Sequence, residues 1–352
     1  ANGQSTATEW VKSYTDFAGR AFQLVYADNA IARSFYNSAG QLVRQVDPDG
    51  VTTLFAYNAR GEQEVVAADL NGNNQIDSAG ADRITRTTAA VTTKIVNAVT
   101  YIVQRSTTHV WETDSADTPV AVSISEQSTN GLRSWQTARG LTTTSVTVLD
   151  GSGGRTVTTT TPDGVKTSQV YLGDRLISTT VRTAADVQLA ATTYVYDAHR
   201  RLESAADARN GASTFTYFAD DQIKTVTTPD PDTTLSGPGY DAQTTTYAYD
   251  AAGRVQTVTQ PDGGVVHTTY WPTGAVKRTW GTRTYPTEYT YGPQGRLATL
   301  TTWQNYAGDT GRAVTTWNYD PARGFLLNKR YADHTGPSYT YQPSGRLLTR
   351  TW

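Results

Sequence analysis

Short segments in which polar and apolar residues alternate recur along the chain. Residues 254–259 read R-V-Q-T-V-T, and residues 247–249 read Y-A-Y, with two aromatic rings two positions apart. Side chains two positions apart project from the same face of a β-strand. Threonine, valine and tyrosine favour strands because branched and aromatic side chains pack well on a pleated surface. The pattern predicts an all-β protein built from short strands.

Turn residues separate these segments at regular positions. Asp250 begins one such turn and Gly253 ends it. An aspartate at the first position accepts backbone N–H bonds, and a glycine at the fourth position tolerates positive φ. The sequence P-D-G at residues 261–263 predicts a second tight turn. Strand, turn, strand and turn together make one β-hairpin unit.

The unit repeats at a fixed spacing. The second tyrosine of the Y-x-Y pair recurs after 21 residues at Tyr249, Tyr270 and Tyr291. The interval lengthens to 28 residues before Tyr319, which places an insertion near residues 305–311. A fixed period of this length indicates tandem structural units. We therefore expect hairpins that join edge to edge, because a single hairpin is at best marginally stable in water.

Aromatic, turn and arginine positions have distinct roles in the expected unit. The tyrosine rings cover one another along the sheet. The arginine after the turn lies over those rings in a cation–π contact worth roughly 0.5–1 kcal/mol. The residues expected to carry the repeat are Tyr36, Gly40, Tyr196, Asp197, Tyr249, Asp250, Gly253, Arg254, Tyr291, Gly295, Arg296, Tyr341, Gly345 and Arg346.

The repeat is not equally clear everywhere. The Y-x-Y-D phrase disappears over residues 83–170, although strand patterning continues there. No Pro/Ser-rich linker or block of charge marks a boundary on either side. We expect one array over residues 1–352: repeats over 1–82 with an insertion near 69–82, degenerate repeats over 83–170 and well-formed repeats over 171–352. A separate domain over 83–170 is the alternative.

The phrase Y-D-A-A-G-R-V at residues 249–255 resembles the Y-D-x-x-G-R-L hallmark of the YD-repeat (Rhs repeat) family. That family includes bacterial polymorphic toxins, toxin-complex shells and teneurins. The resemblance implies a curved or spiralling antiparallel sheet, a segment of a β-shell that in several members encloses a toxin domain. The D-P-x-G motif of the family's shell-closing region is replaced by D-P-A-R-G at residues 320–324. Any enclosed domain is therefore expected outside this chain, which looks too short to close a full shell.

One local motif has the composition of a metal-binding loop. Oxygen-bearing residues alternate through D-L-N-G-N-N-Q-I-D at residues 69–77, as in a calcium loop. The EF-hand pattern would require glycine where Asn74 stands and glutamate where Gly80 stands. An Asn/Gly-rich hairpin insertion without metal is the alternative. The residues that would hold a structural calcium ion are Asp69, Asn71, Asn73, Gln75, Asp77 and Asp82.

Composition removes several classes of function. The formal net charge is −2, so no global basic field favours nucleic acid. No apolar run approaches the roughly 18 residues that a membrane span needs. The absence of cysteine excludes thiol chemistry and mildly favours an exported protein. The four histidines are scattered without a metal-ligand spacing, and no nucleophile motif is present, so we expect no enzyme.

These observations favour a non-enzymatic structural scaffold. We expect a shell segment of a larger secreted or cell-surface protein that encloses or displays a toxin or another partner. Other segments or copies would join through the open sheet edges, because unpaired strand edges invite pairing. One alternative is a subunit of a self-assembling extracellular fibre or tube. Another is a carbohydrate-binding adhesin that stacks sugars on exposed rings at Trp271, Trp280, Trp303 and Trp317.

Overall fold

Every regular element in the computed structural model is a β-strand, within the described residues 8–111, 118–230 and 241–352. The all-β prediction is therefore confirmed. The strands are β1 Val11–Thr15, β2 Ala21–Tyr26, β3 Ile31–Tyr36, β4 Leu42–Val46, β5 Thr52–Tyr57, β6 Gln63–Asp69, β7 Arg83–Val96, β8 Val99–Val110, β9 Val120–Ser128, β10 Arg133–Ala138, β11 Leu141–Leu149, β12 Gly154–Thr160, β13 Lys166–Leu172 and β14 Arg175–Arg182. They continue with β15 Gln188–Tyr196, β16 Leu202–Asp207, β17 Gly211–Tyr217, β18 Ile223–Thr227, β19 Thr244–Tyr249, β20 Val255–Thr259, β21 Val265–Tyr270, β22 Val276–Gly281, β23 Thr287–Tyr291, β24 Leu297–Asn305, β25 Thr310–Tyr319, β26 Leu326–Arg330, β27 Ser338–Tyr341 and β28 Leu347–Thr351.

The strands form one antiparallel meander. Each strand pairs with the next strand along the chain, from β1 with β2 to β27 with β28. Strands β7 to β13, over residues 83–170, belong to the same sheet, and β7 and β8 pair over twelve positions. Among the described strands, β1 pairs only with β2 and β28 only with β27. The outer edges of these two strands are the open edges of the sheet.

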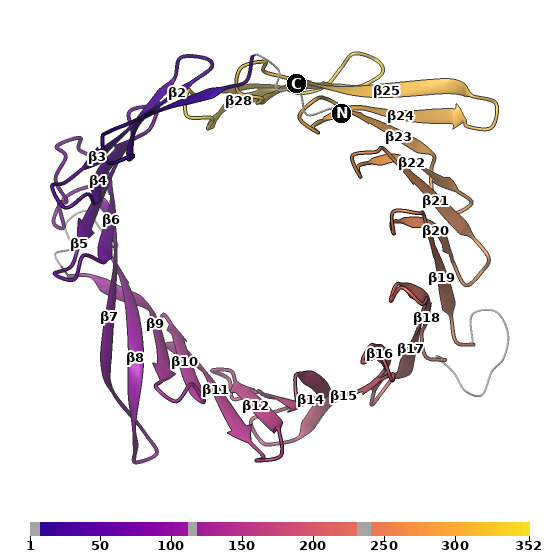
Figure 1. Ribbon diagram of the computed structural model, residues 1–352, viewed down its shortest axis with the longest axis horizontal. Helices are drawn as coiled ribbons and strands as arrows, with labels where there is room; N and C mark the ends of the chain where they lie inside the picture. Colours follow the sequence, from indigo (N-terminus) through magenta and orange to yellow (C-terminus); the bar gives the residue numbers. More distant parts are fainter. Residues whose placement is uncertain (1–7, 112–117, 231–240) are drawn as a thin grey trace.

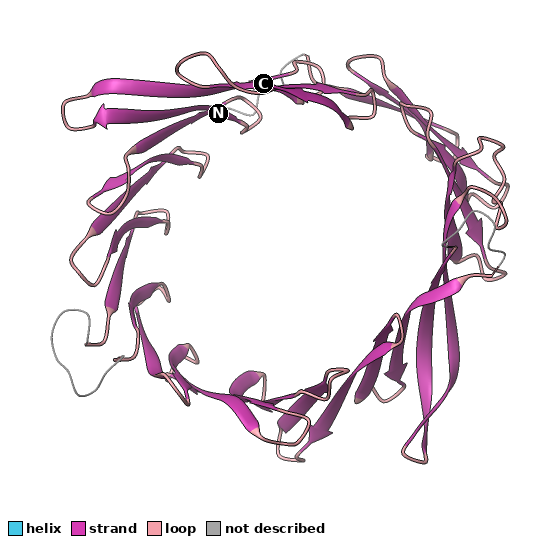
Figure 2. Ribbon diagram, turned by 180° about the vertical axis from the view of Figure 1, so that it is seen from behind, coloured by secondary structure: helices cyan, strands magenta, loops and turns pink. Residues whose placement is uncertain are grey.

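The sheet curves through one complete turn. Figure 1 shows the ribbon running round an open centre until β28 comes back to β2, and Figure 2 shows the same closure from behind. Hydrogen bonds join residues that are 287 to 299 positions apart in the sequence. The meeting of the two ends of the chain was not anticipated from the sequence. A small rotation between neighbouring strands, added over the whole meander, brings the ends together.

The sheet is a single layer, and little of it is buried. The described residues expose 21269 Å², whereas a compact protein of this mass exposes about 14,000 Å². A small core forms where Leu54, Ala67 and Ile84 pack against Val65 and other side chains of neighbouring strands. Contacts between adjacent hairpins therefore replace a thick core as the main source of stability.

A meander places its turns alternately on two rims. We call the rim that carries the turn at residues 250–254 the motif rim, and the rim that carries the P-D-G turns, such as residues 47–51, the opposite rim. Figure 1 shows both rims as loops at the ends of the strands. No helix in the described residues is long and apolar enough to cross a membrane.

Candidate functional site

The turn at residues 250–254 shows how the repeated phrase folds. Gly253 N–H donates to the Asp250 carbonyl at 2.9 Å, and Gly253 has φ of 76°. The Asp250 carboxylate accepts the backbone N–H groups of Ala252 and Arg254, and its second oxygen accepts Arg254 Nε at 2.8 Å. The register shifts next to Tyr249, which marks a bulge after the turn. Hydrogen bonding by Arg254 lowers the pKa of the Asp250 carboxyl.

In eight of the described hairpins, the second tyrosine of the phrase joins its hairpin to an earlier one. Its hydroxyl donates to a carbonyl at or next to the start of an earlier return strand, at distances of 2.7 to 3.0 Å. The pairs are Tyr36 to Ala21, Tyr57 to Leu42, Tyr196 to Leu176, Tyr217 to Leu202, Tyr249 to Ile223, Tyr270 to Val255, Tyr319 to Leu297 and Tyr341 to Leu326. Burial raises the pKa of the Tyr249 and Tyr341 hydroxyls. The tyrosine is therefore both a hydrophobic cover and a fixed hydrogen-bond donor.

The motif arginine stacks on the tyrosine of the following hairpin. The guanidinium carbon of Arg254 lies 4.5 Å from the centre of the Tyr270 ring, and Arg296 lies 5.7 Å from Tyr319. Arg346 instead reaches Asp47 on the opposite rim. The repeat positions thus make contacts within the turn, between hairpins and, at Arg346, across the ends of the sheet.

We expect the variant Gly253→Val to lose about 2 kcal/mol of stability in its own hairpin. A β-branched side chain is strained at the positive φ of Gly253, and its Cβ would lie 2.7 Å from the amide nitrogen of Gln222. Hydrogen exchange of the β19 and β20 amides measures the loss. Gly253→Asn is the control, because asparagine adopts positive φ at low cost. Equal protection in both variants would contradict the assignment of the turn.

The loop at residues 69–82 folds around buried carboxylates. Asp69 is 7% exposed and Asp82 is 2% exposed. Asp69 accepts the N–H groups of Gly72 at 2.7 Å and Asn74 at 2.9 Å. Asp82 accepts the N–H groups of Leu70 and Asp77. These bonds close the loop by backbone capping.

The amides of the same loop surround the third carboxylate. Asn71 Nδ2 and Asn73 Nδ2 both donate to Asp77 Oδ2, at 2.8 and 2.5 Å, and the backbone N–H of Gln75 donates to Asn73 Oδ1. The part of the chain that the structure describes holds no group of three or more His, Cys, Asp or Glu side chains placed for a metal. A calcium ion would need the two amides to turn their oxygens inward.

Calcium binding to this loop stays a prediction. We expect calcium to raise hydrogen-exchange protection in residues 69–82 and to release heat in a calorimetric titration. The variant Asp77→Asn should remove both effects, because a neutral amide replaces the carboxylate that the cation would attract. Asp174→Asn, on an exposed turn, is the matched control. Titration heat identical in the two variants, or none in the unaltered chain, would reject the metal.

A buried ion pair network lies within residues 83–170. The Glu126 side chain is 2% exposed and accepts hydrogen bonds from Lys94 and from Arg105 Nε at 2.8 Å. Burial by itself would raise the pKa of the Glu126 carboxyl, but the hydrogen bonds from the two cations outweigh it and lower the pKa. The Trp135 ring packs 5.6 Å from the Tyr101 ring on the same face. The network braces four neighbouring strands.

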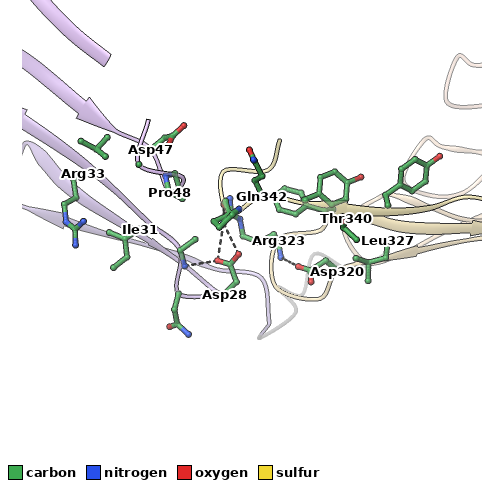
Figure 3. Close-up of a pocket in the computed structure, with 18 residues that line it drawn as sticks. Asp28, Ile31, Arg33, Asp47, Pro48, Asp320, Arg323, Leu327, Thr340 and Gln342 are labelled. Carbon is green, nitrogen blue, oxygen red and sulfur yellow. Dashed lines mark hydrogen bonds and ion pairs between the residues drawn. The ribbon is translucent and has the colours of Figure 1, made fainter. Parts of the chain in front are cut away.

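The seam is the contact between the two ends of the coil. We define it by the motif-rim turns at residues 292–296, 320–325 and 342–346 and the acids Glu9, Asp28, Asp47 and Asp49. Arg323 lies 3.1 Å from both oxygens of Asp28 and stacks 3.9 Å from the centre of the Tyr26 ring. A pocket of about 690 Å³ opens between the two sides (Figure 3). Arginine and aspartate side chains from both ends of the chain line it.

Sequence reasoning missed the seam acids. Glu9, Asp28, Asp47 and Asp49 belong to ordinary turns or strand ends, where backbone capping accounts for aspartate. The signal that points to the seam is a departure from the motif. Gly292 and Gln342 stand where the motif has aspartate.

We expect acid to open the seam. Hydrogen bonding by Arg296 lowers the pKa of Glu9, and for Asp49 the bonds from Ser344 and Arg346 outweigh a burial effect that raises the pKa. Lowered values mean that the stabilisation is complete above the unfolded pKa values, about 4. It is lost as pH falls through the folded values below that.

The Ser344 amide reports this loss, because it donates to Asp49 Oδ1 at 3.0 Å. Its hydrogen exchange, corrected for the intrinsic effect of pH, should accelerate below about pH 4. The Gly345 amide, bonded inside its own turn to the Gln342 carbonyl, is the internal control. Parallel behaviour of the two amides would show that the seam carboxylates do not hold the ends together.

The remaining predicted positions show no clustering. His199 is exposed on its turn, and His267 stacks on Trp280 at 5.3 Å. Trp303 is 4% exposed, and Trp271 donates its indole N–H to the Tyr289 carbonyl at 3.0 Å. Trp317 and Trp280 are half-buried. The adhesin alternative therefore gains no exposed indole from these four residues.

Fold and site define a single-layer array of tandem β-hairpins that coils into a wall. The family model described as RHS Repeat matches residues 36–72 and 239–265. The second of these regions contains the Y-D-A-A-G-R-V phrase at residues 249–255, so the resemblance to this family is confirmed over the two matched regions. No curated protein matches the sequence.

Solved structures with this fold are parts of much longer chains. The complex TcdB2-TccC3-Cdc42 is 14% identical, with a TM-score of 0.56, and the match covers 99% of this chain and 20% of that one. TcdB2-TccC3-TEV is 15% identical, with a TM-score of 0.59, over 97% and 20% of the two chains. The Photorhabdus luminescens Tc holotoxin pore with mutated TccC3 is 14% identical, with a TM-score of 0.55, over 97% and 19%. This chain thus spans about a fifth of the length of these structures.

Proposed function

We propose that this chain is a non-enzymatic wall segment of a larger secreted or cell-surface protein, in which the coiled sheet encloses or displays a toxin or another polypeptide partner. The observation that carries the proposal is the complete turn of the sheet, closed by ion pairs between its ends. A single-layer sheet whose two ends are joined separates an inner space from an outer one, and it needs fewer residues than a wall of two layers. The fold shared with the Tc toxin structures supports the same role.

Limited proteolysis of the protein, expressed from its complete natural reading frame, tests the proposal. We expect a polypeptide outside residues 1–352 to resist protease while the array is intact. It should become sensitive when the seam is opened by Arg296→Ala, Arg323→Ala and Arg346→Ala together. The matched control is Arg20→Ala, Arg201→Ala and Arg254→Ala, whose arginines pair within their own turns. Equal cleavage in all three proteins would overturn the enclosing role.

The fibre alternative rests on the free edges of β1 and β28. All five residues of each strand are exposed, so a second copy meets no steric cover there. Sedimentation at increasing protein concentration separates the two functions. A constant monomer mass favours the wall segment, whereas growth into long assemblies favours the fibre.

A further inference from the structure

Five of the described motif-rim turns have arginine at their fifth position, and these arginines fall into two groups. In three turns the first residue is aspartate, and the arginine binds it. Arg20 Nε lies 2.7 Å from Asp16 Oδ2, and the corresponding distance is 2.8 Å in the other two turns. Those turns pair Arg201 with Asp197 and Arg254 with Asp250. The guanidinium in these turns braces its own turn, and Nη1 of Arg201 and of Arg254 also reaches the next hairpin, at Asp221 and at the Trp271 carbonyl.

In the other two turns the first residue carries no charge. Gly292 begins the turn that ends at Arg296, and Gln342 begins the turn that ends at Arg346. Both guanidinium groups leave their own turns. Arg296 binds Glu9 in a two-pronged contact of 2.6 and 2.7 Å. Paired N–H donors of this kind match the geometry of a carboxylate.

Arg346 makes the corresponding contact further along the seam. Its two terminal nitrogens lie 2.6 Å from Asp47 Oδ2 and 2.9 Å from Asp49 Oδ2. Asp49 also accepts the backbone N–H of Ser344. These acids belong to the P-D-G turn of the opposite rim, about 300 residues earlier in the chain.

The third seam arginine, Arg323, reaches across the seam although its turn keeps an aspartate. The turn at residues 320–325 has aspartate first, but arginine is its fourth residue. Asp320 accepts the backbone N–H groups of Ala322 and Arg323, at 3.0 and 2.6 Å. The Arg323 side chain points away from Asp320 toward Asp28 and is 10% exposed (Figure 3).

We propose that loss of the turn aspartate converts the motif arginine from an internal brace into a docking group, and that turns of this kind form a binding surface for the acidic opposite rim of the preceding coil. A local aspartate wins the competition for the guanidinium because it is always within reach. Without it, the arginine projects from the motif rim with its charge unpaired. The departure from the motif thus marks which hairpins touch the neighbouring coil.

The inference goes beyond the wall function, since it concerns how successive coils bind and not what they surround. If the seam responds to the turn residue but no polypeptide is protected from protease, the inference holds and the proposed function fails. If a polypeptide is protected but the seam does not respond to the turn residue, the proposed function holds and the inference fails.

Restoring the aspartate is the direct test. The chain lacks cysteine, so Gln45→Cys and Thr340→Cys provide two spin-label sites, one on each side of the seam. In this background, Gly292→Asp with Gln342→Asp should make Arg296 and Arg346 bind the new aspartates of their own turns instead of the acids across the seam. Pulsed electron resonance should then show a longer, broader distance distribution. If each ion pair contributes roughly threefold, the ratio of open to closed populations rises about tenfold.

Gly292→Asn with Gln342→Asn is the matched control. Asparagine has nearly the same size and caps the turn in the same way, but it does not neutralise the arginine, so the seam should stay closed. A distribution shared by the Asp and Asn variants would overturn the proposal. Arg346→Ala and Arg254→Ala give an independent comparison if the double variants do not fold. Only Arg346→Ala should open the seam, and equal distributions for these two variants would also overturn the proposal.

Discussion

Replacing Trp135 by alanine is expected to destabilise the centre of the array by about 3 kcal/mol or more. Trp135 is 3% exposed in β10 and contacts the Tyr101 ring and the Lys94 ammonium group. Its removal leaves a void that a single-layer sheet has no second layer to fill. Trp135 stands directly opposite Glu126 in the pairing of β10 with β9. Its removal therefore also uncovers one side of the buried Glu126 network.

The loss should be local, because each hairpin contacts only its neighbours and repeat arrays open in segments. Hydrogen exchange of β8 to β11 should accelerate, while β20 to β23 should be unchanged. Trp352→Ala is the matched control, since Trp352 is 79% exposed and its loss should change stability by less than about 0.5 kcal/mol. Similar exchange in the two variants would show that Trp135 is not a packing centre.

The second large effect is expected at Gly281, at the end of β22. Gly281 has φ of 153°, and a Cβ at this position would collide with the backbone carbonyl oxygen of Val265 in β21. The colliding atom belongs to the backbone, so relief requires the two strands to separate. We expect Gly281→Ala to cost about 3 kcal/mol, combining strain with overpacking.

Gly274→Ala separates the collision from the conformational strain. Gly274 has φ of 89°, and no atom lies within 4 Å of its Cβ position. Its substitution should therefore cost only about 1–2 kcal/mol. Hydrogen exchange of β21 and β22 compares the two variants. If Gly274→Ala were as damaging as Gly281→Ala, the close approach of Gly281 to Val265 would be wrong.

The hairpin unit could be predicted from sequence because its determinants are local. Asp250, Gly253 and Tyr249 act within a few residues of one another or on the adjacent hairpin. Turn chemistry and the two-residue alternation of strands are readable at that range.

The full turn of the sheet could not be predicted in the same way. It depends on a small angle between neighbouring strands, and a modest error in that angle accumulates over the whole meander. The seam contacts could not be predicted either, because nothing in the local sequence of Glu9 or Asp28 indicates a partner almost 300 residues away. Arg296 and Arg346 have no aspartate in their own turns, and this gives a signal only once the braced turns are known for comparison.

The buried network escaped prediction for a related reason. Glu126 lies where the repeated phrase is absent, and its partner Lys94 belongs to β7, two strands away. Cross-strand pairs of this kind depend on strand register, which the degenerate repeats of residues 83–170 do not specify.

Small-angle X-ray scattering from the monomeric chain tests the central claim, a one-layer hairpin array coiled through a full turn. A compact domain of 352 residues would have a radius of gyration of about 20 Å. We predict a value well above this, together with the scattering minimum of a hollow particle. A radius of gyration near 20 Å and the smooth curve of a solid globule would contradict the account.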